Sequence, residues 1–85
     1  MLPPWEGALV PRAPAPDHAL ATVLKRLREE RRMTQESVAW HAGIAVATLQ
    51  KIEHGQTAPS WDSVSRIIDA LGVKLSELAA AVEAA

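Results

Sequence analysis

The chain has 85 residues, a formal net charge of −1 and no cysteine. This length allows one small domain with a limited core, to which a dimer interface would add. Without cysteine, neither a disulfide framework nor a cysteine-based zinc site can form. The sequence has no apolar run of the roughly 18 residues that a membrane span needs, and no signal-peptide pattern at its start. We therefore expect a cytoplasmic protein without a membrane segment.

The charges are unevenly distributed along the chain. Five basic residues cluster before residue 33, namely Lys25, Arg26, Arg28, Arg31 and Arg32. Acids dominate the C-terminal part, namely Asp62, Asp69, Glu77 and Glu83. A DNA-binding domain is usually basic, so the total charge argues against nucleic-acid binding. The polarised distribution of the charges argues for it.

Residues 1–16 contain five of the six prolines and show no helical periodicity. Because proline cannot donate to a helix or a strand ladder, this stretch is expected to be an extended Pro-rich arm. A disordered tail is one interpretation. In the other, the arm packs on a partner through Trp5, Leu9 and Val10, or reaches a DNA groove with Arg12.

Residues 17–85 are expected to form one all-α domain, since apolar residues recur at helical spacing and no alternating strand pattern appears. N-cap residues precede three of the helices, namely Asp17, Thr34 and Ser60. Glycines follow three helices, namely Gly43, Gly55 and Gly72. The predicted helices span about 18–32, 35–42, 46–54, 61–71 and 75–84.

The second and third of these helices have the spacing of two helices that cross through a very short turn. Ala39 is small enough for a close crossing, and Gly43 supplies the positive φ that the turn needs. The remaining inward positions are all apolar, namely Val38, Ala42, Ile44, Leu49 and Ile52.

This pattern resembles the helix-turn-helix of the phage repressor/Cro (XRE-type) family of transcriptional regulators. The resemblance extends from about Leu24 to Leu78 and does not include the arm. It implies a five-helix repressor-like domain that binds specific double-stranded DNA as a bacterial or phage-type regulator. The expected role is that of a repressor, and the expected state is a homodimer.

The resemblance also implies a set of DNA contacts. The helix at 46–54 would enter the major groove and present Val46, Ala47, Gln50 and Lys51 to the bases. Lys51 can donate to guanine, and Gln50 can pair with adenine or take a phosphate. Phosphate contacts are implied for Gln35, Thr48, Gln56 and Thr57.

Further positions of the family pattern concern the fold rather than DNA. Arg28 and Glu53 stand where the family has an ion pair that fixes the angle between helices. Two departures weaken the base-reading surface. Ala45 cannot cap the third helix as Ser or Thr would, and Val46 and Ala47 replace the long polar residues that the family often has there.

The expected burial differs between the tryptophans. Trp61, at the start of the fourth helix, is expected to be a semi-buried core residue. Trp40 is expected to face outward on the second helix, covered by the arm or by another subunit. Trp5, Leu9, Val10 and Trp40 are therefore candidate protein contacts. The three histidines have no metal-ligand spacing, so neither metal nor cofactor is expected.

Two other functions remain open. An antitoxin would bind its operator and, through the arm, a toxin. A protein-interaction module would keep the fold without binding DNA, which the net acidity and Val46 and Ala47 favour. No nucleophile–base constellation or phosphate loop appears, so an enzyme is not expected.

Overall fold

The computed structural model describes residues 18–85, which form five helices and no strand. The helices are α2 (His18–Glu30), α3 (Gln35–Ala42), α4 (Val46–Glu53), α5 (Trp61–Leu71) and α6 (Leu75–Ala84). The expected all-α class is confirmed for this part of the chain. The Pro-rich arm, with Trp5, Leu9, Val10 and Arg12, and the predicted cap Asp17 lie outside the described residues.

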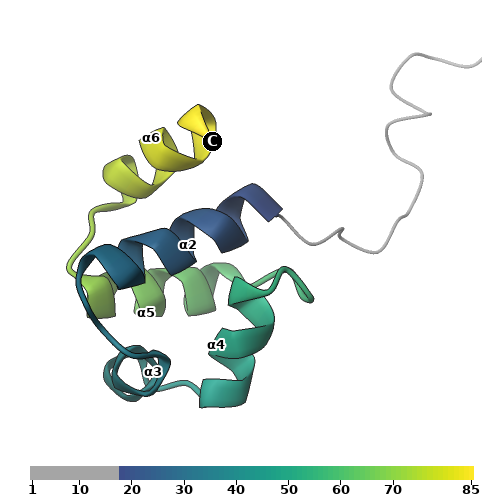
Figure 1. Ribbon diagram of the computed structural model, residues 1–85, viewed down its shortest axis with the longest axis vertical. Coiled ribbons are helices and arrows are strands. Elements are labelled where there is room, and N and C mark those ends of the chain that lie inside the picture. Colours follow the sequence, from purple (N-terminus) through teal and green to yellow (C-terminus); the bar gives the residue numbers. More distant parts are fainter. Residues whose placement is uncertain (1–17) are drawn as a thin grey trace, which may run out of the picture.

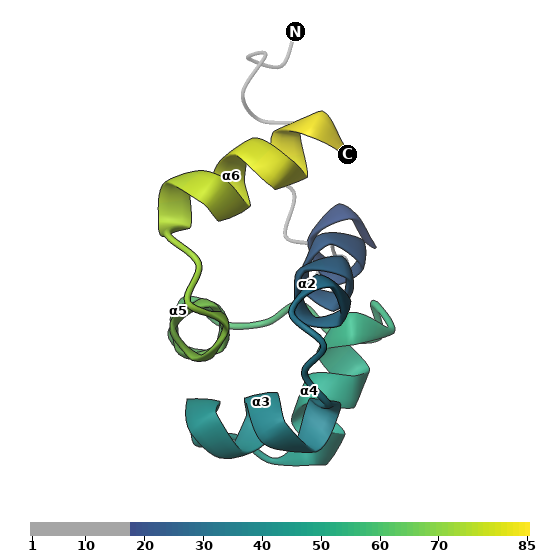
Figure 2. The same ribbon diagram turned by 60° about the vertical axis from the view of Figure 1, so that its left-hand side comes forward.

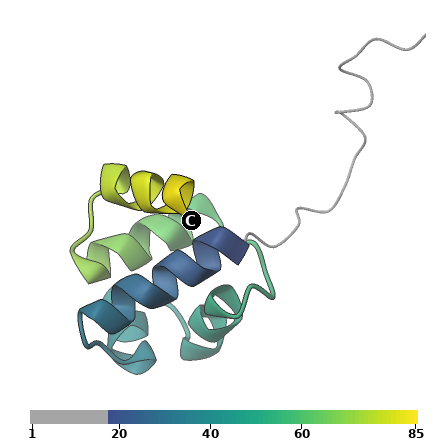
Figure 3. The same cartoon turned by 45° about the horizontal axis from the view of Figure 1, so that its top comes forward.

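The helices α2 and α5 occupy the middle of the domain. The short helices α3 and α4 lie on one side of them and α6 lies on the other (Figures 1 and 2). The beginning of α2 lies beside the end of α6, as the turned view also shows (Figure 3). The α3–α4 pair is thereby left with an open outer surface, far from α6.

The core contains residues from all five helices. Its largest fully buried side chains are Leu24, Leu49, Ile52, Ile67, Val23 and Val38. These come from the predicted inward stripes of α2 to α5, and α6 contributes Leu78. Ile44, also predicted to face inward, is partly buried and packs against the core. Core burial on this scale is the main stabilising contribution in so small a domain.

Four of the helices end in the same way, with a residue in the left-handed region. In three of them this residue is the predicted glycine, Gly43, Gly55 or Gly72, each with φ near 70°. In α3, Gly43 N donates to Trp40 O and Ile44 N to Ala39 O, which is the Schellman arrangement.

The first helix ends two residues earlier than predicted, at Glu30 rather than residue 32. Arg32 has a φ of 54°, the one positive φ of a non-glycine residue within 18–85. Its N–H donates to Glu29 O and that of Met33 to Arg28 O, so α2 closes with the same motif as α3. An arginine thus stands where glycine is usually found.

The predicted caps Thr34 and Ser60 are confirmed: each side chain accepts a hydrogen bond from the backbone N–H three residues later. Ala45 caps α4 without a side-chain bond, as its residue type requires. The helix α4 ends at Glu53, one residue before the predicted end, because His54 is its C-cap.

The expectation for Trp61 was wrong. Its side chain is 62% exposed, so it is a surface residue rather than a semi-buried one. As the first residue of α5 it precedes the inward stripe, which begins at Val64. Of the helices in residues 18–85, none combines the length and the apolar character of a membrane span.

Candidate nucleic-acid interface

The α3–α4 crossing is built on a small residue and a glycine turn. Ala39 is 1% exposed, and its carbonyl accepts the hydrogen bond that closes the turn after α3. At Gly43 (φ 70°) a side chain would be strained, and its Cβ would lie 3.3 Å from Arg66 Nη1. These residues set the close approach of the two helices and so fix how α4 is presented.

A bidentate ion pair joins α2 to the end of α4. Arg28 donates from Nε to Glu53 Oε2 at 2.8 Å and from Nη2 to Glu53 Oε1 at 2.9 Å. The Glu53 side chain is 1% exposed and that of Arg28 is 13% exposed. The third donor, Nη1, bonds Met33 O at 3.0 Å, in the connection to α3. One guanidinium therefore fixes α2, α4 and the start of α3 relative to one another.

The hydrogen bond with Glu53 raises the pKa of Arg28 above its ordinary value. Burial opposes this shift, and the charges of Glu53, Glu29 and Glu36 add to it. Since the pKa rises from an already high value, the guanidinium stays charged throughout the neutral range.

A hydrogen-bonded chain runs from this ion pair to the outer face of α4. Gln35 donates from Nε2 to Glu53 Oε1 at 3.2 Å, and its Oε1 accepts from Gln50 Nε2 at 3.4 Å. The sequence assigned Gln35 to a phosphate and did not connect it to either residue. Its amide is partly engaged within the fold, and one N–H remains for the predicted phosphate contact.

The four predicted base-reading residues lie together on α4. Ala47, Gln50 and Lys51 are exposed, while Val46 is half-buried and packs against the core. This surface offers one ammonium group, one amide and two small apolar groups to a groove.

The predicted phosphate contacts flank this surface but are not equally available. Thr48 is exposed on α4, and Gln56 and Thr57 are exposed in the loop after Gly55. The backbone N–H of Gln56 donates to Lys51 O at 2.9 Å, so it closes α4 and does not reach outward. Only the side chain of Gln56 is left for a phosphate.

Much of the basic cluster of α2 is used inside the domain. Arg31 donates to Leu71 O at 2.8 Å and to Leu27 O at 3.2 Å, which ties the end of α2 to the end of α5. Arg26 pairs with Glu30 on the surface. Because the sequence shows charges but not their partners, it overstated the number of cations available to DNA.

Trp40 is 82% exposed on α3, facing outward as predicted. Its proposed neighbours in the arm lie outside the described residues. Within residues 18–85, no group of three or more His, Asp and Glu side chains is arranged so that it could hold a metal ion.

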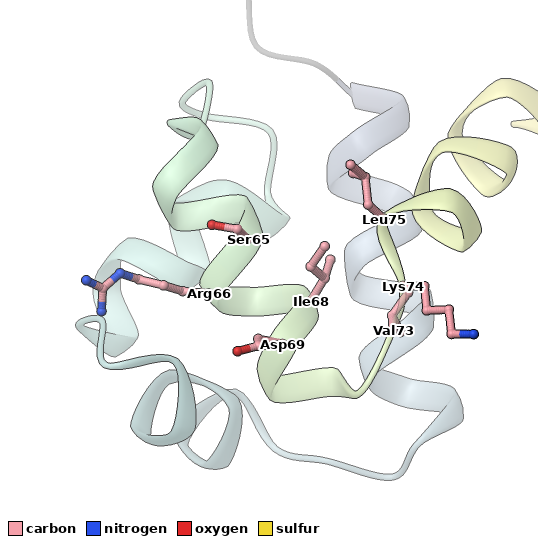
Figure 4. Close-up of a pocket in the computed structure, with 7 residues that line it drawn as sticks. All are labelled: Ser65, Arg66, Ile68, Asp69, Val73, Lys74 and Leu75. Atoms are coloured by element: carbon pink, nitrogen blue, oxygen red, sulfur yellow. The ribbon is translucent and has the colours of Figure 1, made fainter.

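An open hollow of about 560 Å³ lies beside α5 at the entrance to α6. Figure 4 shows Arg66 and Lys74 pointing away from one another at its edges. Ser65 Oγ donates to Asp62 O and Arg66 Nε to Asp62 Oδ2, so these polar groups are engaged within α5.

Two short helices that cross through a glycine turn, supported by three more, define the helix-turn-helix class. The family model described as a helix-turn-helix domain matches residues 19–81, and the chain belongs to this family. No curated protein matches the chain in sequence at a significant level.

Solved structures of a gene regulator and of controller proteins have a similar fold. One is the restriction-modification controller protein C.Esp1396I, a tetramer with its natural 35 base-pair operator (TM-score 0.78, 21% identity, 85% of this chain, 95% of that one). Another is the clp gene regulator ClgR from C. glutamicum (TM-score 0.76, 19% identity, 85% of this chain, 94% of that one). A third is the restriction-modification controller protein C.AhdI from Aeromonas hydrophila (TM-score 0.69, 24% identity, 72% of this chain, 92% of that one). The predicted repressor-like fold is thereby confirmed.

Proposed function

We propose that the chain is a transcriptional regulator that binds specific double-stranded DNA with α4 in the major groove. The observation that carries the proposal is the exposed pair Gln50 and Lys51 on a helix whose angle is fixed by the Arg28–Glu53 ion pair. Rigid presentation of a few polar side chains is what direct readout requires. The protein would act by binding, without catalysis, in the cytoplasm, where bacterial DNA lies.

The hydrogen-bonded chain also gives Gln50 a defined orientation. Glu53 is an acceptor only, so Gln35 must turn its NH₂ toward Glu53 and its oxygen toward Gln50. Gln50 then keeps its own oxygen and one N–H for the groove. Adenine offers a matching donor and acceptor, whereas a phosphate offers acceptors alone, so the orientation favours adenine.

Self-association belongs to the proposal. One α4 presents few polar groups, and a homodimer doubles the contact by placing two recognition helices about 34–36 Å apart. The controller protein C.Esp1396I forms a tetramer in complex with its operator, which supports an oligomeric regulator of the same fold. Repression is the expected effect, because a dimer on an operator obstructs the promoter.

The test is a gel shift with the DNA upstream of the protein's own gene, at several salt concentrations. Binding should weaken as salt rises, because phosphate contacts release counterions. Lys51→Ala should lower the affinity at least fivefold, whereas Lys74→Ala, an exposed lysine at the start of α6, should leave it unchanged. Equal effects of the two variants would contradict the placement of α4.

The other two functions predict different outcomes. A protein-interaction module, which the half-buried Val46 and the exposed Trp40 favour, predicts no DNA binding even at low salt. An antitoxin predicts operator binding together with a stable complex with the product of a neighbouring gene. A light-scattering mass of the free chain separates a homodimer from a monomer in every case.

A further inference from the structure

An apolar groove lies between α6 and the starts of α2 and α5. It has a volume of about 480 Å³ and is framed by α2, the loop before α5, α5 itself and α6. Its walls are mostly aliphatic, and two of the three large exposed apolar residues of the described domain, Trp61 (62%) and Leu75 (49%), line it. Exposed apolar surface of this kind marks a contact site.

The chain itself contains a segment with matching chemistry. The arm carries Trp5, Leu9 and Val10, followed by Pro11-Arg12-Ala13-Pro14. Pro-rich segments of the PxxP kind favour the polyproline II conformation and dock in grooves that contain aromatic side chains. The groove offers Trp61 beside Pro59 for this purpose.

The arm is also attached at the right place. It enters α2 at His18, and Leu20, two residues later, already lines the groove. The ten residues 8–17 can span at most about 36 Å when extended, which exceeds the length of about 15 Å of a ten-residue helix such as α6. A short tether of this kind gives an effective concentration of about millimolar, so weak contacts suffice.

One pair of charges is complementary in this arrangement. Glu83 lines the groove where the end of α6 lies beside the start of α2 (Figure 3). Arg12 is the one cation of the arm, and it lies between the apolar segment and the attachment point. An Arg12–Glu83 pair would be exposed and worth little energy, but it would select one direction of the arm along the groove.

We propose that the N-terminal arm folds back into the groove between α2, α5 and α6 of its own chain and covers Trp61 and Leu75. Trp40 is a less suitable partner, because it lies on α3, on the opposite side of α2 and α5 from α6 (Figure 2). The proposal does not depend on DNA binding.

Disulfide trapping tests this placement, since the chain has no cysteine of its own. One variant of the full chain combines Ala8→Cys with Ala79→Cys, which lines the groove. The matched control combines Ala8→Cys with Ala80→Cys, the next residue of α6, which is exposed but does not line it. Oxidation in dilute solution should close the first pair within one chain at least tenfold faster than the second.

Three results would overturn the proposal. Equal rates for the two pairs would mean that the arm has no preferred place. Disulfides mainly between chains would assign the groove to a second copy. Faster closure of Ala8→Cys with Glu36→Cys, one turn before Trp40 on α3, would place the arm at Trp40 instead.

A second measurement needs no cysteine. With Trp5→Phe and Trp40→Phe, Trp61 is the only tryptophan. Acrylamide should quench its fluorescence less in the full chain than in a chain that begins at residue 15. Equal quenching in the two chains would show that the arm does not cover Trp61.

Discussion

The side-chain oxygen of Gln35 accepts a hydrogen bond from Nε2 of Gln50, 3.4 Å away. Through this bond a side chain on the outer face of α4 is connected to the buried carboxylate of Glu53. A base-reading amide is thus oriented by an ion pair that itself faces the interior.

Gln35→Ala should therefore weaken base discrimination more than affinity. Without its partner, the amide of Gln50 can turn over, and preference for adenine at its position should fall about fivefold, the lower end of the 1–3 kcal/mol of a good bidentate pair. Anisotropy with the operator and its single-base variants measures this. Gln56→Ala, an exposed glutamine outside the chain of bonds, should lower the affinity for every sequence alike. The same uniform loss with Gln35→Ala would mean that Gln35 holds a phosphate only.

Removing one partner of the ion pair should destabilise the domain strongly. Arg28→Met leaves the carboxylate of Glu53 buried without its cation, which costs about 3 kcal/mol or more. Urea unfolding measures the loss. Arg66→Met breaks an exposed pair with Asp62 and should cost less than about 1 kcal/mol.

The double variant Arg28→Met with Glu53→Leu separates net stability from the cost of an unpaired charge. It should recover much of the loss of Arg28→Met, because no buried charge is left. If the double variant were no more stable than Arg28→Met alone, the ion pair would contribute to stability chiefly through packing. DNA binding by a stable double variant should still be weaker, since Gln35 loses its acceptor.

Arg32→Gly should stabilise the protein. Arg32 has a φ of 54°, a conformation that costs a residue with a Cβ about 1–2 kcal/mol and glycine almost nothing. A gain of about 1 kcal/mol raises the melting temperature by about 4–8 °C in a domain of this size. Arg32→Ala, which removes the charge but keeps the Cβ, is the control and should give no such gain.

Ala45→Ser should also stabilise the fold, by about 1 kcal/mol. Ala45 already has the extended backbone of an N-cap (φ −70°, ψ 142°), and serine would supply the missing acceptor for α4. Thermal unfolding without DNA measures this. A drop in stability would mean that the start of α4 cannot accommodate the hydroxyl group.

Most of the fold could be predicted because its signals are local. Apolar spacing, the caps Thr34 and Ser60 and the glycines at helix ends each act within a few residues of sequence. The conformation of Arg32 gave no such signal, since an arginine in the left-handed region is rare. Trp61 was mispredicted because it is the first residue of α5 and precedes the inward stripe, which begins at Val64.

The candidate site was predictable in its members but not in their connections. Family spacing indicated Arg28 with Glu53, and both form the bidentate pair. Gln35 and Gln50 are 15 residues apart, and only the crossing angle of α3 and α4 brings them within reach. The same holds for Arg31 and Leu71 O, 40 residues apart, whose bond removes a cation from the predicted basic cluster.

The repeated left-handed ends of α2 to α5 have a consequence for how the chain folds. Each helix boundary is marked by bonds between residues at most five positions apart, so its position along the sequence is specified locally. Chains dominated by such local contacts fold in microseconds to milliseconds. A nascent polypeptide of this kind would become competent to search for a partner soon after α6 leaves the ribosome.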